Sequence, residues 1–422
     1  MLTLRHSVGV LVLAGALAAT SSCKKPELLR GSDDKFTVGN LDRGAELVER
    51  FECGRCHAGP ELHTKSEKAC VTCHEDIVAG SFKASPEAIA KWQPIVRDLR
   101  FAPSLEGAAR YRSAFLVSFL QNPHDLRPNL TMSMPRLAIS EADARDITTY
   151  LRHMSQAPPA TSHAIGAPDL EKGDAQNGRV LLGQKGCTHC HVMTGGPAIP
   201  APTAPPTLPA VTERAMALAP DLRYARDRFE PAMLAAWIEK PSAMKVGSDM
   251  PDLPMTRTEA RDIATFLLTA PLAPRAAKGF ARLPVLERPV KFDEVNAKVF
   301  HRTCWHCHSE PDFAIGDGGP GNSGGFGFPA RGVDLSSFQG VMAGFFDRAP
   351  GAAADAGPPR RKSLFAPAAD GTPRLLASLL ARHREEDGAV TGEVRGMPLG
   401  LPALSAADIQ LVETWIAQGR PR

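Results

Sequence analysis

The chain has 422 residues, which is more than one ordinary domain holds and predicts two to four domains. Its 49 Lys and Arg nearly balance 46 Asp and Glu, and the basic run at residues 360–362 lies in a stretch rich in Pro, Gly and Ala. Nucleic-acid binding needs a clustered basic face, so this composition excludes it. Because Gly (36) and Pro (37) are abundant and Tyr (3) and Trp (4) are rare, we expect much loop.

Residues 1–23 resemble an export signal. Arg5 and His6 precede the uncharged apolar run 8–19, which is shorter than the about 20 residues that span a membrane. No later segment has 18 uncharged apolar residues in a row. We therefore expect an exported protein on the periplasmic side of a bacterial membrane.

Cys23 follows Thr20, Ser21 and Ser22, which resembles a bacterial lipobox, where the Cys becomes the lipid-modified first residue. Leu is usual at the position of Thr20, and residues 16–18 offer a competing cleavage site. Cys23 is also the only cysteine outside the motifs described next. We expect a lipid anchor on Cys23, with residues 24–39 as a tether; the alternative is a cysteine left in a cleaved signal.

The other eight cysteines all occur in the pattern Cys-x-x-Cys-His, which is present four times. The motifs are Cys53, Cys56 and His57; Cys70, Cys73 and His74; Cys187, Cys190 and His191; and Cys304, Cys307 and His308. Two thiols at this spacing can bind both vinyl groups on one edge of a porphyrin, and the adjacent His can bind the iron. The pattern predicts four covalently attached haem c groups.

Two alternatives use the same cysteines. Cys53, Cys56, Cys70 and Cys73 have a spacing that a four-thiolate zinc site tolerates, and paired cysteines can form disulfides. Neither explains a His directly after every pair. Zinc also leaves the two isolated pairs, at Cys187 and Cys304, without partners.

A second pattern occurs three times: a Met-Pro pair followed by a helix-start signal of Ser or Thr, two residues and an acid. These elements are Met134-Pro135, Met250-Pro251 and Met397-Pro398, then Ser140 with Asp143, Thr256 with Glu259 and Ser405 with Asp408. Apolar residues follow each cap at offsets of 7, 10 and 11, which predicts one buried helix face. They are Ile147, Tyr150 and Leu151; Ile263, Phe266 and Leu267; and Val412, Trp415 and Ile416.

Short helical stretches at residues 45–51, 179–182 and 295–300 precede the first, third and fourth Cys-x-x-Cys-His motifs. The order helix, motif, loop, Met-Pro and capped helix resembles class I cytochromes c over most of residues 40–420. The resemblance implies an all-α fold of three tandem domains, each with crossing first and last helices and haem in a crevice. The third domain contains Gly396-Met397-Pro398-Leu399-Gly400 and ends in Trp415-Ile416-Ala417-Gln418-Gly419. In these segments it resembles cytochrome domains common in planctomycete and myxobacterial proteins.

The resemblance also implies a methionine as the sixth iron ligand in each domain. It pairs His57 with Met134, His191 with Met250, and His308 with Met397. A thioether opposite an imidazole raises the reduction potential, as suits an electron carrier. Core filling is the alternative use of these methionines, and Met132, Met244 and Met255 are rival ligands.

Composition gives the domain boundaries. Pro-rich segments at 155–170 and 270–290 are typical of linkers, so we predict a dihaem domain at 40–155 and monohaem domains at 171–270 and 291–420. Residues 197–209 and 316–332 lie between a motif and its Met, and we expect them to form loops over the haem.

The haem on Cys70 and Cys73 lacks an obvious sixth ligand, because the first domain has two motifs but one Met-Pro pair. His63 is the first candidate, another His (His124 or His153) or a Met is the second, and an open or exchangeable position is the third. Cys56 and Cys70 are close in sequence, so we expect the first two haems to be neighbours.

These features predict a tetrahaem cytochrome that carries electrons between redox partner proteins. No dinucleotide fingerprint, Walker motif or catalytic triad signature is present, so we expect no dinucleotide cofactor and assign no catalytic residue. One alternative is a peroxidase-like enzyme that uses the second haem. The other is the cytochrome subunit of a membrane dehydrogenase or oxidase complex.

Overall fold

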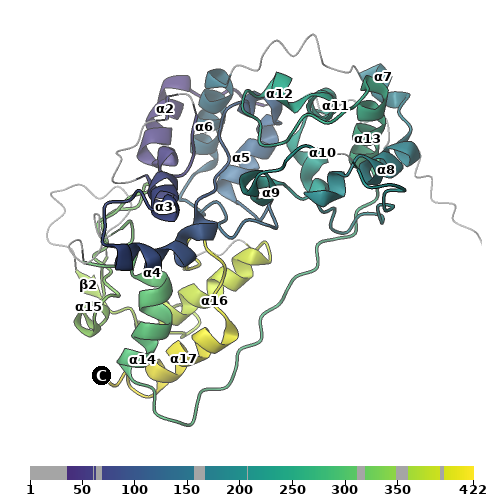
Figure 1. Cartoon of the computed structure of the whole chain (residues 1–422). Helices are drawn as coiled ribbons and strands as arrows, with labels where there is room; N and C mark the ends of the chain where they lie inside the picture. The colour runs from purple at the N-terminus through teal and green to yellow at the C-terminus, as the bar shows by residue number, and fades with distance from the viewer. Residues whose placement is uncertain are drawn as a thin grey trace, which may run out of the picture.

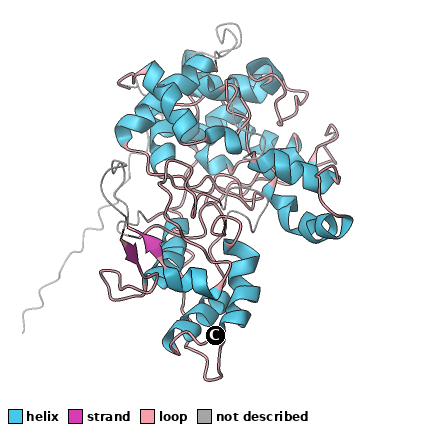
Figure 2. Cartoon of the chain, turned by 90° about the vertical axis from the view of Figure 1, so that its left-hand side faces the viewer, coloured by secondary structure: helices cyan, strands magenta, loops and turns pink. Residues whose placement is uncertain are grey.

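The computed structural model describes residues 36–59, 61–62, 69–155, 167–206, 208–310, 319–347, 360–389 and 394–422 (Figure 1). Cys23 and His63 lie outside these residues, so the expected anchor and the first candidate ligand of the second haem do too. The described chain is mostly helical, as expected. Its strands β1 (Phe345–Phe346) and β2 (Arg361–Lys362) form a small antiparallel pair (Figure 2).

The first region, residues 36–155, is built around helices α2 and α6, which pack on each other. Its elements are α2 (Leu41–Arg50), α3 (Cys70–Ala79), α4 (Pro86–Val96), α5 (Ser113–Gln121) and α6 (Glu141–Met154), with short 3-10 turns at Cys53–Arg55, Arg97–Leu99 and Ala108–Arg110. Ser140 caps α6 in a full capping box with Asp143, which confirms the predicted helix start. Helices α3, α4 and α5 were not predicted.

Gly44 lets α2 approach α6. A Cβ on Gly44 would lie 2.3 Å from the carbonyl oxygen of Asp146 and 2.7 Å from Cβ of Tyr150, which no larger residue tolerates without moving a helix. The carboxylate of Asp146 accepts a 2.7 Å hydrogen bond from the backbone N–H of Asn40, the N-cap of α2. The end of α2 is thus bonded directly to α6.

The second region, residues 167–271, repeats this arrangement. Its elements are α7 (Ala167–Glu171), α8 (Ala175–Gln184), α9 (Glu213–Leu218), α10 (Ala225–Arg228), α11 (Pro231–Glu239), α12 (Pro241–Met244) and α13 (Arg257–Thr269), with 3-10 turns at Cys187–His189 and Leu222–Tyr224. A Cβ on Gly178 of α8 would lie 2.0 Å from the carbonyl oxygen of Asp262 in α13. The Asp262 carboxylate accepts from the N–H of the α8 N-cap, Asp174, at 3.1 Å. Thr256 and Glu259 form the predicted capping box.

The third region, residues 286–422, departs from this pattern. Its elements are α14 (Phe292–Val295), a π-helical turn (Asn296–Cys304), α15 (Phe338–Ala343), β1, β2, α16 (Arg374–Glu386) and α17 (Ala406–Ala417). Val295, nine residues before Cys304, is fully buried. The first and second regions have glycines, Gly44 and Gly178, at the corresponding positions. The predicted cap Ser405 starts α17, and Trp415 of α17 is wholly buried against Phe300 and Phe365.

The predicted helix faces are confirmed. Of the nine residues at offsets 7, 10 and 11, eight are buried and Ile416 is partly buried. They belong to three separate hydrophobic clusters, one in each region.

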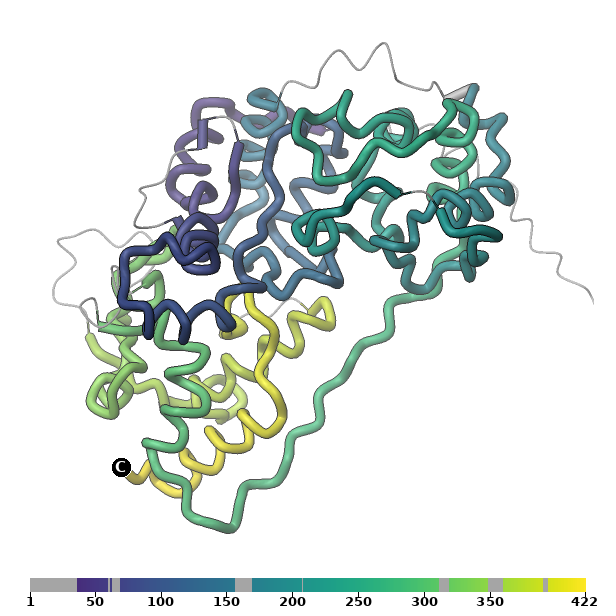
Figure 3. Tube along the Cα trace, in the orientation of Figure 1, coloured from purple at the N-terminus to yellow at the C-terminus, as the bar shows by residue number. Residues whose placement is uncertain are grey.

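Hydrophobic packing extends a few residues beyond three of the expected boundaries. Phe36 and Gly39, placed in the tether, belong to the fold: Phe36 packs on the first cluster and the Gly39 N–H donates to Oγ1 of Thr149 at 2.8 Å. Leu170, placed in a linker, is a buried core residue on α7. The 270–290 linker has no helix (Figure 3), but Val290 at its end lies in the third cluster.

The first region contacts both others. Towards the second, the N–H of Asp221 donates to the Leu126 carbonyl at 2.8 Å, and the rings of Tyr111 and Phe229 lie 5.0 Å apart. Towards the third, the N–H of Phe326 donates to the Glu52 carboxylate at 2.8 Å. The first region is therefore in contact with the loop at Phe326, which lies more than 150 residues beyond the end of that region in the sequence.

Candidate haem-binding sites

Three of the four motif histidines donate a hydrogen bond to a backbone carbonyl. Nδ1 of His57 lies 2.8 Å from the Pro103 oxygen, Nδ1 of His191 lies 2.7 Å from the Pro220 oxygen, and Nδ1 of His74 lies 2.8 Å from the Leu99 oxygen. A carbonyl oxygen only accepts, so Nδ1 carries the proton in each ring. This tautomer leaves the lone pair of Nε2 for a metal, which is the usual way that an outer hydrogen bond orients a ligating His.

Burial keeps these rings neutral. It lowers the pKa of His57, His74 and His191, and the carbonyl hydrogen bond opposes this effect only in part. A neutral imidazole is the form that binds a metal. The three rings are therefore in the correct protonation state as well as the correct tautomer.

His308, in the fourth motif, is held differently. Burial lowers its pKa to about 4, although the Val333 carbonyl opposes the shift. Nδ1 of His308 has no hydrogen bond of standard geometry among the described residues. The ring is instead fixed by packing, because a Cβ on Gly321 would lie 2.0 Å from its Cε1 atom.

A second hydrogen bond ties each carbonyl-bearing loop to its motif. The N–H of Leu105 donates to the Ala58 carbonyl and the N–H of Leu222 donates to the Val192 carbonyl, each at 2.8 Å. In the third region the N–H of Leu335 donates to the carbonyl of His308 itself at 2.7 Å. This contact recurs in all three regions and holds the loop beside the motif histidine.

The backbone before the motif differs among the regions. Glu52 and Gly186 have left-handed backbones, with φ of 53° and 73°, and each starts a 3-10 turn that contains the first Cys. In the third region the π-helical turn runs directly into Cys304. The second motif is different again, because Cys70, Cys73 and His74 all lie on the single helix α3.

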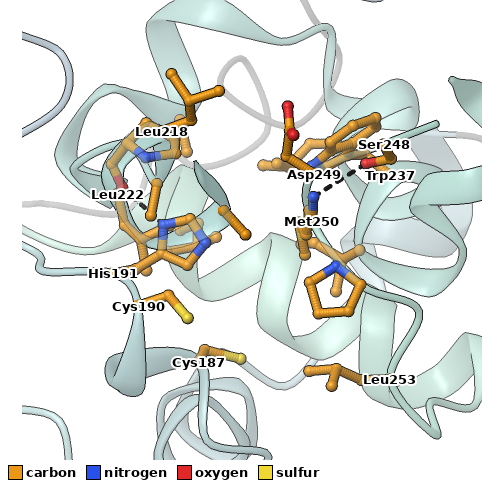
Figure 4. A pocket seen from close by; sticks show the side chains of 18 of the residues that line it. Cys187, Cys190, His191, Leu218, Leu222, Trp237, Ser248, Asp249, Met250 and Leu253 are labelled. Atoms are coloured by element: carbon orange, nitrogen blue, oxygen red, sulfur yellow. Dashed lines mark hydrogen bonds between the residues drawn. The ribbon is translucent and has the colours of Figure 1, made fainter. Parts of the chain in front are cut away.

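In the second region, His191 and Met250 face each other across a pocket, with Cys187 and Cys190 at its edge (Figure 4). Met255 lines the same pocket, so it stays a rival of Met250, whereas Met244 is packed at 6% exposure on α12. In the first region Met134 packs on the cluster that Cys53 contacts, and in the third Met397 packs on the cluster that Cys304 contacts. The three Met-Pro methionines thus lie near their motifs.

Four cations from two regions also border this pocket: Arg110, Arg127, Arg228 and Lys245. None of them forms an ion pair with a carboxylate among the residues that the structure describes, and the Nε atoms of Arg110 and Arg228 are buried without a partner there. Burial of Tyr111 beside them raises its pKa, but the four cations together lower it to about 7.

Buried cations need an anion. A haem carries two propionates, so a haem held by Cys187, Cys190 and His191 would bring negative charge to these cations, beyond that of Asp221 and Asp249, which also line the pocket. Because Arg110 and Arg127 belong to the first region, the site draws on two regions. No local sequence pattern indicates this cluster, because its members are scattered over more than 130 residues.

The first two motifs meet at their cysteines. The thiol of Cys56 forms a hydrogen bond with that of Cys70, which raises the pKa of Cys56 and lowers that of Cys70. This contact agrees with the expectation that the first two attachment sites are neighbours. None of the eight motif cysteines is in a disulfide, and no group of three His, Cys, Asp or Glu side chains among the described residues could hold a metal ion.

The structure places the remaining histidines as follows. His124 lies between the rings of Phe119 and Tyr224, and His153 is exposed on α6. His306, which sequence reasoning did not consider, has its ring centre 6.3 Å from that of His74. The sequence pattern that could have drawn attention to His306 is Cys-x-His-Cys-His, which occurs in the third and fourth motifs.

Comparison with known proteins gives one family match. Residues 175–271 match the cytochrome c family. Neither the curated proteins nor the solved structures contain a match to the chain. Among the described residues, every helix is too short or too polar to cross a membrane. The match covers α8, the third motif, Met250 and α13, so the chain contains a cytochrome c domain, whose family binds haem c covalently and which supports a haem-based role in electron transfer.

Proposed function

We propose that the chain is a tetrahaem c-type cytochrome, with haem c at all four motifs, that carries electrons in a bacterial periplasmic or membrane-surface chain. The observation that carries the proposal is the shared environment of the motif histidines. All four are shielded enough for burial to lower their pKa, and His57, His74 and His191 each donate Nδ1–H to a carbonyl. The matched cytochrome c domain contains only one of these histidines, His191. We therefore extend haem binding to the other three motifs on the basis of their similar environment.

Each residue type has a distinct part. The paired cysteines would attach the haem edge through thioether bonds, Nε2 of each motif His would bind the iron, and Met134, Met250 and Met397 would supply the sixth ligand in their regions. The haem supplies one-electron chemistry. The protein positions the haems, excludes water and sets their potentials through ligands and buried charge.

The arrangement of the regions supports transfer between haems. The contact of Cys56 with Cys70 brings the first two attachment edges together, and the first region contacts both other regions. We infer three domains, at 40–155, 171–270 and 291–420, with the dihaem domain between its neighbours in space. Electrons would then pass through the first domain to travel from the second to the third.

Export and anchoring are part of the proposal and rest on sequence alone. Residues 1–23 would direct export, and a lipid on Cys23 would hold the protein at the periplasmic face of a membrane. Redox proteins would be its partners there. These residues lie outside the part of the chain that the structure describes.

Counting haems tests the proposal. The intact mass of the protein made in a host that attaches haem c should exceed the polypeptide mass by four haems. Replacement of both cysteines of one motif by Ser should lower the count by one, with Cys70→Ser and Cys73→Ser as the most informative pair. A wild-type protein with one haem, at Cys187 and Cys190, would reduce the proposal to the cytochrome c domain alone.

A further inference from the structure

The histidine of the second motif, His74, lies near another histidine ring. The ring centres of His74 and His306 are 6.3 Å apart, with an angle of 44° between the rings. His306 lies in the fourth motif, between Trp305 and Cys307, and is 232 residues from His74 in sequence. The pair therefore exists only because the third region packs on the first.

This separation is compatible with one iron between two imidazoles. A metal–imidazole bond is about 2 Å long, and the ring centre lies about 1 Å beyond the nitrogen, so two rings on opposite sides of one iron have centres about 6 Å apart. The rings are not stacked face to face, as those of Phe280 and His383 are at 3.7 Å, although tilted apolar pairs such as Phe292 and Phe300 also lie 6.3 Å apart. Rings on a common iron can rotate about the bond axis, so 44° is compatible.

His74 is prepared as a ligand. Its Nδ1–H donates to the Leu99 carbonyl at 2.8 Å, which leaves Nε2 to bind a metal. The ring is only 9% exposed. His74 is thus a fixed partner for a second ligand.

Contacts elsewhere on the first region hold the third region against it. The loop that follows the fourth motif docks on the first region: the N–H of Phe326 donates to Glu52, Arg55 lies over the Phe326 ring, and Phe328 packs on the first cluster. A Cβ on Gly327 would lie 2.6 Å from the Phe51 ring. Glu52 and Arg55 belong to the first motif, which contacts the second through Cys56 and Cys70.

We infer that His306 is the sixth ligand of the haem attached to Cys70 and Cys73, so that this iron has two histidine ligands from two regions. The inference rests on the proposed haem at the second motif. It replaces His63, His124 and His153 as candidates and closes the position that a peroxidase-like reaction would need open. Two imidazoles also give this haem a lower potential than its Met-ligated neighbours.

The ligand would also join two haems covalently. His306 is bonded to Cys307 through one peptide link, and Cys307 would carry the thioether of the fourth motif's haem. A bonded path would then run from the second iron through His306 and Cys307 to that haem.

The matched variants are His306→Ala and His189→Ala. His189 has the same place in the third motif and is likewise exposed. With four haems attached, wild type should show one bis-histidine and three His–Met irons by near-infrared magnetic circular dichroism. His306→Ala should convert one iron in four to high spin, and its reduced form should bind one CO per chain. His189→Ala should do neither.

Two further measurements separate ligation from a structural role. Added imidazole should return the His306→Ala iron to low spin, and His306→Met should raise the number of His–Met irons from three to four. The inference is wrong if wild type carries four haems without a bis-histidine iron, or if His306→Ala keeps its bis-histidine signal. A wild type that lacks the haem on Cys70 and Cys73 would overturn the proposed haem count itself.

Discussion

The N–H of Ser133 donates a 2.9 Å hydrogen bond to the carbonyl oxygen of Gly400. Ser133 precedes Met134, and Gly400 follows Met397 by three residues, so the two methionine loops of the first and third regions touch. Arg382 reinforces this contact by donating to the Ser133 hydroxyl at 3.0 Å. Among the described residues, no hydrogen bond joins the Met250 loop of the second region to Ser133 or Gly400.

This contact gives a prediction for the methionine ligands. Met134→Ala, Met250→Ala and Met397→Ala should each remove about a third of the charge-transfer band that marks Met-ligated ferric haem, and the affected potential should fall because a soft ligand is lost. Potentials in Met134→Ala with Met397→Ala should shift by an amount that differs from the sum of the single shifts, whereas Met250→Ala with Met397→Ala should be additive. Redox titration checks both.

The rivals are tested in the same way. If Met250→Ala leaves the band and all potentials unchanged, Met250 fills the core. Met255→Ala should then be the variant that weakens the band and lowers the potential. A band that survives the triple replacement would remove all three methionines from the ligand set.

The helix crossing in the second region predicts a stability effect. Gly178→Ala places a Cβ 2.0 Å from the Asp262 carbonyl oxygen, so α8 and α13 must separate, at a cost of about 2 kcal/mol in the free energy of unfolding. Gln176→Ala, on an exposed position of the same helix, should change it by less than about 0.5 kcal/mol. Denaturant unfolding of the haem-loaded protein measures both, and equal effects would contradict the close contact.

The cation cluster predicts a change of potential. Arg228→Ala removes a buried positive charge beside the second region's pocket, and positive charge favours the reduced iron. The potential of that haem should fall by on the order of 50 mV, the size expected for one charge at partial screening. Arg226→Ala is the control, because Arg226 is on the same helix but donates to Ala270. A larger shift in Arg226→Ala than in Arg228→Ala would contradict the cluster's role.

The proposed anchor predicts a change of location. Cys23→Ser should move haem-containing protein from the membrane fraction to the soluble fraction, because stable anchoring needs about two acyl chains, at about 0.8 kcal/mol per buried methylene. Fractionation followed by haem staining measures this. Wild type that is already soluble, with an unmodified N-terminus, would exclude the lipid.

Local signals explain what the sequence predicted well. The caps Ser140, Thr256 and Ser405 start helices because a hydroxyl three residues before a backbone N–H needs no tertiary partner. Burial of Ile147 and Trp415 was predicted from their offsets after the cap, which follow the period of a single helix. Both are properties of short segments and so can be read from the chain alone.

Features that depend on docking were missed. His306 meets His74, and Arg110 meets Arg228, only after separate regions have packed, and no local pattern encodes that packing. Helix α3 was missed for another reason: the Cys-x-x-Cys-His pattern indicates attachment chemistry and not a helix, although Cys70, Cys73 and His74 also form the first turns of α3.

The bond between Phe326 and Glu52 joins residues 274 positions apart, and contacts of such long range form late in folding. A chain that crosses a membrane from its N-terminus would deliver the first region well before the loop that covers it. Cys56 and Cys70 would stay accessible during that interval, when an attachment enzyme must reach their thiols. Arrival of the last 100 or so residues would then close the first region, so the order of synthesis itself would set the order of assembly.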